Sequence, residues 1–329
     1  MPRRHVAGRG GAHASASPSP SFKAPLFRPL LLAALIVAPL GAAPVFAAPG
    51  DLARTVRFKL SAGDLFTGDA AAAEYKREHG VDAEYLSAVG WLARGAALLG
   101  RTEAAWTYVA ELRREIPAER DGVIGAFGAA IETEGRLRAQ RDGRGPALRF
   151  LESEFARAKD TELRCRIRKN VNLLSLEGQP APELAAPEHV GAAPPLLAGL
   201  EGRPVLLFLW AHWCGDCRAQ APIVGRVLAK YGPKGLAVVA PTRLFGTGAG
   251  DKDATPAEEK VEIERVWKEF YGSLAGVSAP IDTETMVRYG VSSNPTLVLV
   301  DKSGLVRLYT PTRMSEEQLS RRIEELLAE

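Results

Sequence analysis

Cys214 and Cys217, which two residues separate, are the side chains of this chain best suited to do chemistry. They follow a continuous apolar run, 204–210, that is typical of a buried strand, and they precede an amphipathic run that predicts a helix. If that helix begins at about Cys214, its unpaired backbone N–H groups and the positive end of its dipole stabilise a thiolate there. The pattern predicts a redox dithiol in which Cys214 is the nucleophile and Cys217 resolves the mixed disulfide.

Other chemistries of a Cys-x-x-Cys pair need residues that are not found near it in the sequence. The chain has one further cysteine, Cys165, and no second Cys-x-x-Cys or closely spaced histidine pair, which argues against a four-ligand zinc site. Covalent haem attachment needs a histidine directly after the second cysteine, and Arg218 stands there. We therefore expect no metal and no organic cofactor. A purely structural disulfide stays open as an alternative.

The N-terminal residues have the composition of an export signal. Residues 1–47 carry five basic residues and no acidic one, and an apolar run, 30–40, follows the basic part. The small-residue pattern that ends at Ala47 predicts cleavage after that residue, so we expect residues 1–47 to be a signal peptide. An uncleaved membrane anchor is the alternative, although Pro39 and Pro44 interrupt the segment and make it a poor spanning helix.

Composition predicts a globular protein of about two domains behind this leader. The chain has 329 residues, of which 46% are hydrophobic and 25% charged. Without the five basic residues of the leader the formal charge of +3 becomes −2, so the basic composition does not indicate nucleic-acid binding. Export would place the dithiol in a periplasmic or other extracytoplasmic compartment, where a partner must set its redox state.

The first predicted domain, 51–178, shows helical periodicity and almost no strand signal. Its candidate helices, each bounded by Gly, Pro or a capping residue, are 83–99, 102–116, 121–134, 146–158 and 161–176. The small and apolar residues of one pair have the spacing of a tetratricopeptide unit: Leu92, Ala93, Gly100, Ala105 and Pro117. No second copy is found, so a generic helical bundle stays the alternative. A protein partner is the expected ligand of such a domain.

Strands and helices alternate in the second predicted domain, 179–329, which opens with a Pro- and Ala-rich connection. The predicted strands are 204–210, 235–241, 277–281, 296–301 and 304–310. The predicted helices are 214–231, 256–272, 283–289 and 315–328. This alternation predicts an α/β sheet flanked by helices, in which the turn at 301–304 joins the last two strands as an antiparallel hairpin.

Four motifs occur in order within residues 178–329. They are a lead-in over Gly178–Leu184, Gly202-Arg203-Pro204 before a strand, Trp213–Cys217 with Pro222 five residues on, and Val291–Thr296 before a later strand. Together they resemble the thioredoxin fold and, within it, the exported TlpA-like and ResA-like disulfide oxidoreductases. The resemblance implies a mixed central sheet and a disulfide reductase that acts on protein disulfides and receives electrons from a membrane donor.

The same resemblance suggests where a substrate binds. Pro295 matches the proline that is cis in this family and packs against the dithiol, and Asn294 before it offers backbone groups to an extended substrate strand. An ordinary trans proline at the start of a strand is the alternative. Trp213 is expected to form an apolar rim for the partner, whereas Trp210 is expected in the core.

Two carboxylates of the wider family are absent at their usual positions. Thioredoxin has an acidic residue six before its first cysteine, where this chain has Phe208, and TlpA-like proteins often have Glu where this chain has Gln220. Gln220 forms hydrogen bonds but cannot accept the proton of Cys217. Asp216 is the candidate for proton transfer, with a solvated role in the first helical turn as its alternative. His212 is expected at the surface beside the site.

Two alternative functions and the role of Cys165 stay open. A peroxiredoxin-like peroxide reductase would need a Thr-x-x-Cys motif, and Ala211 stands at the threonine position. A binding protein would hold its partner in the helical domain and keep the dithiol as a structural or vestigial pair. Cys165, flanked by two arginines on a predicted helix, is expected to be a half-buried small hydrophobe, or a reactive thiolate if it is exposed.

Overall fold

A computed structural model describes residues 51–193, 197–250 and 252–328. The predicted signal peptide and its cleavage site lie outside these residues. The described residues belong to one compact unit of the chain. Within them, no helix combines the length and the apolar character that a membrane crossing requires.

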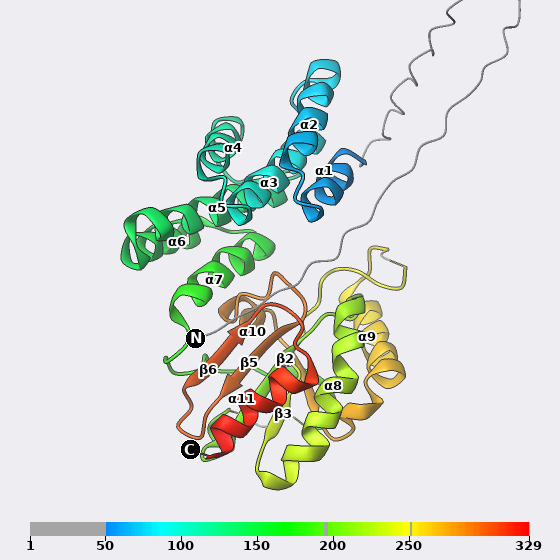
Figure 1. Ribbon diagram of the computed structural model, residues 1–329. Helices are drawn as coiled ribbons and strands as arrows, with labels where there is room; N and C mark the ends of the chain where they lie inside the picture. The colour runs from blue at the N-terminus through cyan, green and yellow to red at the C-terminus, as the bar shows by residue number, and fades with distance from the viewer. Residues whose placement is uncertain (1–50, 194–196, 251, 329) are drawn as a thin grey trace, which may run out of the picture. The chain divides into compact units, whose positions relative to one another are not determined.

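The helical region contains seven α-helices over the described residues 51–175 (Figure 1). They are α1 (Asp51–Ser61), α2 (Leu65–His79), α3 (Ala83–Leu98), α4 (Thr102–Glu115), α5 (Ile124–Asp142), α6 (Arg144–Arg157) and α7 (Thr161–Ser175). The sequence had predicted helical periodicity at α1 and α2 without resolving them as elements. The helix predicted over 121–134 begins later, because Gly122 adopts φ 78°, and continues to Gly143, which adopts φ 88°.

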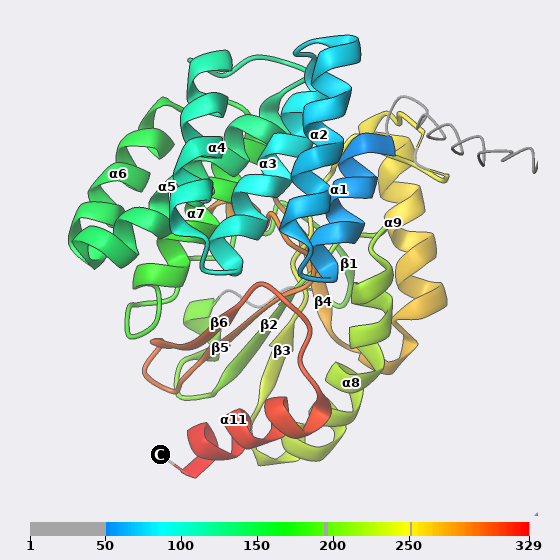
Figure 2. The ribbon, with the colours of Figure 1, turned by 45° about the horizontal axis from the view of Figure 1, so that its top comes forward.

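Small residues let the helices of this region approach closely, and Figure 2 shows α3, α4 and α5 side by side. A Cβ at Gly90 of α3 would lie 3.1 Å from the Cβ of Ala129 in α5. Ala93 and Ala105 are fully buried, as the close packing of a helical hairpin requires. The tetratricopeptide interpretation of this hairpin stays a prediction. The buried apolar residues of α1–α7 form a core of their own.

The sheet region contains a six-stranded mixed sheet. Its strands are β1 (Glu188–Gly191), β2 (Val205–Leu209), β3 (Ala237–Val239), β4 (Ser278–Ile281), β5 (Thr296–Val300) and β6 (Val306–Thr310). Their order is β1-β4-β3-β2-β5-β6; β2, β3 and β4 run parallel, and the other neighbouring pairs are antiparallel. The predicted hairpin of the last two strands is therefore confirmed. The boundary between two domains near residue 178 stays a prediction.

β1 was missed, because the sequence reads as a connection where this strand lies. It has four residues, pairs only with β4 and buries only Val190. An edge strand of this length has too few alternating apolar residues to give a periodic signal.

Helices cover both faces of the sheet: α8 (Gly215–Tyr231), α9 (Pro256–Phe270), α10 (Thr283–Arg288) and α11 (Glu316–Ala328). Successive side chains of β2 point to opposite faces, so Leu206 and Phe208 pack in the core with α8, α9 and α11. Leu207 packs on the other face, in the core that contains Met286 of α10. Phe208 thus occupies an apolar core position, where the sequence of thioredoxin has an acid.

Candidate active site

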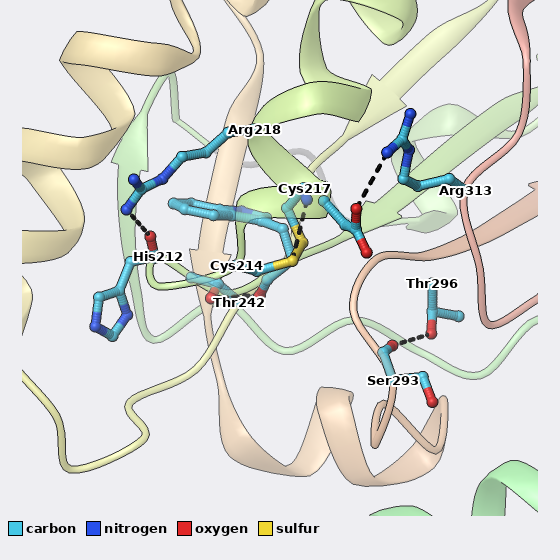
Figure 3. The surroundings of a disulfide bond; sticks show 10 residues. His212, Cys214, Cys217, Arg218, Thr242, Ser293, Thr296 and Arg313 are labelled. Carbon is cyan, nitrogen blue, oxygen red and sulfur yellow. Dashed lines mark hydrogen bonds and ion pairs between the residues drawn. A yellow bond between two sulfur atoms is a disulfide. The ribbon is translucent and has the colours of Figure 1, made fainter. Parts of the chain in front are cut away.

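The dithiol lies where β2 turns into α8, at the helix N-terminus (Figure 3). Cys214 is the N-cap of α8, and its Sγ accepts a hydrogen bond from the backbone N–H of Cys217 at 3.0 Å. The two cysteines form a disulfide, with their Cα atoms 5.3 Å apart. The helix start predicted at about Cys214 is confirmed. Cys214 keeps 6% of its surface exposed and Cys217 none, so an incoming sulfur has access to Cys214.

The loop before β5 ends beside the dithiol. The Asn294–Pro295 peptide bond is cis, as the resemblance implied. β5 pairs with β2 in a register that places Thr296 opposite Leu209, so this loop and the dithiol loop leave the same end of the sheet. Thr296 donates its hydroxyl to the carbonyl of Ser293 at 2.8 Å, and Figure 3 shows both residues near the disulfide.

The two candidates for proton handling both contact the loop between β6 and α11. The Gln220 side chain is fully buried, and its Oε1 accepts a hydrogen bond from the backbone N–H of Met314 at 3.0 Å. Asp216 is exposed, and its Oδ1 lies 3.1 Å from Nη1 of Arg313 (Figure 3). The Arg313 cation therefore offsets the negative charge that Asp216 would otherwise present beside the thiols. Proton transfer by Asp216 stays a prediction.

His212 corrects an expectation, because it is a buried residue and not a surface one. Only 2% of its surface is exposed. Its Nε2 lies 3.0 Å from the carbonyl of Thr247, and its Nδ1 lies 3.7 Å from Oε1 of Glu259, a fully buried carboxylate on α9. Burial lowers the pKa of His212, and the Glu259 carboxylate partly opposes that shift. The neutral imidazole then donates from Nε2 to Thr247.

Aromatic side chains form the surroundings of Cys214. Trp213 is 45% exposed, and its ring meets that of Phe245 edge-on at 5.4 Å between centroids. Trp210 is buried, as predicted, and donates its Nε1–H to the carbonyl of Ala240 at 2.9 Å. Thr242 binds the same segment, since its hydroxyl donates to the carbonyl of Trp210 at 2.8 Å (Figure 3).

Sequence reasoning missed Phe245, Glu259 and Arg313. Each lies between 31 and 99 residues after Cys214 in the chain and approaches the dithiol only in the folded protein. The burial of Glu259 has no local signature, because this residue stands in a helix that reads as amphipathic and rich in glutamate. Only the fold brings these residues to the site.

Cys165 lies apart from this chemistry, in the second turn of α7. The residue is fully buried, more so than predicted, with its Sγ 3.8 Å from the carbonyl oxygen of Met286. Burial raises the pKa of its thiol to about 12, which leaves the thiolate unpopulated at neutral pH.

Among the residues that the structure describes, no three His, Cys, Asp or Glu side chains form a group that could hold a metal ion.

The chain is similar in sequence to thiol-disulfide oxidoreductases. No family model matches the chain. It is 27% identical to the thiol:disulfide interchange protein DsbE of Xylella fastidiosa over 158 residues. This alignment covers 47% of this chain and 71% of the relative. It is 24% identical over 134 residues to the thiol-disulfide oxidoreductase ResA of Geobacillus thermodenitrificans, covering 40% and 67% respectively.

One solved structure is similar to part of this chain. A thiol:disulfide interchange protein of the thioredoxin family from Chlorobium tepidum aligns with a TM-score of 0.33 and 18% identity, over 45% of this chain and 96% of that one.

Proposed function

The sheet region of the chain is a thioredoxin-like thiol-disulfide oxidoreductase of the TlpA/ResA/DsbE family, and on that premise we propose that the protein is an exported disulfide reductase. The observation that carries this proposal is the position of Cys214 as the N-cap of α8, where its sulfur accepts a backbone N–H. That position favours a thiolate, the form of cysteine that attacks a disulfide.

Reduction begins with Cys217 as a thiol and Cys214 as the thiolate that its N-cap position favours. The Cys214 thiolate attacks one sulfur of a substrate disulfide and forms a mixed disulfide. The second substrate sulfur leaves as a thiolate and takes a proton from solvent. The N–H of Cys217 stabilises the Cys214 sulfur before the attack.

Release of the substrate uses Cys217, one helical turn away. Cys217 loses its proton and attacks the Cys214 sulfur, and the first substrate sulfur leaves as a thiolate. Two electrons have then passed from the dithiol to the substrate, and Cys214–Cys217 is a disulfide, which is the state of the structure. Gln220 cannot accept the proton of Cys217, so the acceptor is solvent or Asp216.

Substrate docking is assigned to the surface beside Cys214. Trp213 offers an exposed apolar ring next to the nucleophile. Asn294 and Pro295 precede β5 at the same end of the sheet as the dithiol, where an extended substrate segment would find backbone groups to pair with. Strand pairing of this kind gives affinity with little sequence demand, which suits an enzyme for many protein disulfides.

The leader supports the direction and the location of the reaction. An apolar run behind basic residues predicts export, and an oxidising compartment already favours disulfides, so a dedicated reductant is the more useful role there. A reductant there needs a membrane electron donor that reduces Cys214–Cys217 after each turnover. The direction predicts a reduction potential closer to about −270 mV, the value of thioredoxin, than to about −120 mV, the value of a strong oxidant. Equilibration with a glutathione buffer measures it.

The proposal is tested by the reduction of insulin with dithiothreitol as the electron source. We expect the protein to accelerate this reaction and Cys214→Ser to remove the acceleration. Cys217→Ser, reduced and then freed of dithiothreitol, should instead accumulate a mixed disulfide with an insulin chain through Cys214, which mass spectrometry of the adduct identifies. A rate equal to the dithiothreitol background, or an adduct through another cysteine, would contradict the proposal.

A further inference from the structure

The segment after β3 forms a wall beside the dithiol; we call residues 243–247 the rim segment. The ring of Phe245 lies 5.4 Å from that of Trp213 and 6.0 Å from that of His212, measured between centroids. The carbonyl of Thr247 lies 3.0 Å from Nε2 of His212. The rim segment thus contacts the two residues that directly precede Cys214.

One anchor of the rim segment comes from α9. The carboxylate of Glu259 accepts hydrogen bonds from the backbone N–H groups of Phe245 at 2.6 Å and of Gly246 at 2.8 Å. Glu259 is fully buried, so these bonds are shielded from water and charge-assisted. The backbone of the rim segment is fixed from within the sheet region, whereas the ring of Phe245 has its own support.

That support is Arg243. Its guanidinium lies 4.2 Å from the centre of the Phe245 ring, which is within cation–π range. The same guanidinium pairs with the carboxylate of Glu162 in the first turn of α7. Arg243 is buried, whereas the Glu162 side chain is 57% exposed. A chain of contacts therefore leads from α7 of the helical region through Arg243 and Phe245 to Trp213.

α7 is itself held firmly against the sheet region by contacts that do not involve Glu162. Nδ2 of Asn172 donates to the carbonyl of Arg288 at 3.1 Å. Gly290 approaches the α7 backbone so closely that a Cβ there would lie 2.3 Å from the nitrogen of Lys169. Loss of the Glu162 carboxylate would therefore leave α7 in place and release only Arg243.

We propose that Arg243 is a positioning residue of the dithiol site, through which Glu162 of α7 fixes the Phe245 ring and thereby Trp213 beside Cys214. The inference deepens the proposed function and rests on it. Phe245 and Trp213 together form an apolar surface for the residue that neighbours the disulfide of a protein substrate. The helical region thus governs the affinity for protein substrates and leaves the intrinsic reactivity of Cys214 unchanged.

The test compares Glu162→Gln with Glu284→Gln. Glu284 is a matched control, because it is 54% exposed and pairs with Arg164 of α7 at 3.4 Å, but belongs to α10 and not to the rim. We expect Glu162→Gln to raise the KM for insulin by about threefold, in line with the strength of a partly exposed ion pair, with kcat unchanged. The rate with 5,5′-dithiobis(2-nitrobenzoic acid) should stay the same in both variants, because this small disulfide does not need the rim.

A double variant shows whether Glu162 acts through Phe245. Phe245→Leu should raise the KM for insulin at least as much as Glu162→Gln, and the double variant should be no worse than Phe245→Leu alone. Additive effects, or equal effects of Glu162→Gln and Glu284→Gln, would overturn the inference.

A readout without substrate separates this inference from the proposed function. The fluorescence of Trp213, taken as the difference between each protein and its Trp213→Phe counterpart, should change in Glu162→Gln and not in Glu284→Gln. An unchanged spectrum in Glu162→Gln would overturn the inference. A wild-type protein that reduces neither insulin nor the small disulfide would overturn the proposed function instead, whatever the spectra show.

Discussion

Cys165 within α7 and Cys214 at the N-cap of α8 have opposite chemistry. Cys214 caps the N-terminus of α8, accepts a backbone N–H and reaches the surface. Cys165 lies inside α7, faces a backbone carbonyl and is buried, which raises the pKa of its thiol to about 12. The place of a cysteine along its helix, together with its access to water, decides whether a thiolate forms.

Charged residues next to a cysteine in the sequence do not predict whether its thiol forms a thiolate. Cys165 stands between Arg164 and Arg166, which would favour a thiolate if they faced it. Adjacent side chains on a helix point in different directions, however. Arg164 lies 3.4 Å from Glu284, and Arg166 donates to the carbonyl of Gly125. Burial is the largest influence on the pKa of the Cys165 thiol, and the opposing charge of Arg164 does not outweigh it.

The largest expected effect is the difference between removing one thiol and removing the other. Cys214→Ser should remove the acceleration of insulin reduction and return the rate to the dithiothreitol background, since it deletes the nucleophile. Cys165→Ser should leave the rate within about twofold of the wild type, because Cys165 lies on another helix, and substitutions at separate sites act independently. Initial rates with dithiothreitol as the donor measure both, and a large loss in Cys165→Ser would break the comparison.

The free energy of unfolding should fall more in Cys165→Ser than in Cys214→Ser, the reverse of the order expected for activity. Cys165→Ser places a hydroxyl in a buried apolar site and should lower the free energy of unfolding by about 1–2 kcal/mol. Cys214→Ser, compared with the reduced wild type, should cost less, because a serine is also a good N-cap. Urea unfolding followed by circular dichroism, with both proteins fully reduced, measures the two differences. Equal losses would contradict the contrast between the sites.

The α8 site should also be the more sensitive of the two to acid. Burial lowers the pKa of His212, so the folded protein resists protonation there while the unfolded chain accepts a proton below about pH 6.5. The unfolded state then binds more protons, and stability should fall as the pH drops from 7.5 to 5.5. His212→Gln should flatten this slope in urea unfolding. An identical slope in wild type and variant would contradict the assignment.

The smallest effect is expected from the ion pair of Asp216 and Arg313. Both side chains are largely exposed, so their charges act weakly on the Cys214 thiolate and are screened by salt. Asp216→Asn should speed the alkylation of Cys214 by less than about threefold at low salt, and Arg313→Gln should slow it by a similar factor. Effects of the same sign in the two variants would contradict this account.

The dithiol chemistry was predictable from sequence because its determinants are local. Cys214, Cys217 and the start of α8 lie within a few residues of one another, and the strand before them has a continuous apolar pattern. The cis peptide bond at Pro295 followed from the order of motifs in the resemblance. The helix start is set by capping, which acts over one turn.

The rest of the site depends on contacts between distant segments. His212 reads as a surface residue in sequence, but in the fold it contacts the rim segment and Glu259 of α9 and is buried. The burial of Cys165 likewise depends on Met286, which comes 121 residues later. β1 gave no signal, because an edge strand of four residues is defined by its pairing with β4 and not by its own pattern.

The central claim is that the helix N-terminus makes Cys214, alone among the three cysteines, the reactive thiol. The direct test is to treat the fully reduced protein at pH 7 with a substoichiometric amount of iodoacetamide and to locate the label by mass spectrometry of peptides. The account predicts that the label appears first on Cys214, later on Cys217, and on Cys165 only after unfolding. Labelling of Cys217 before Cys214, or of Cys165 in the native protein, would contradict it.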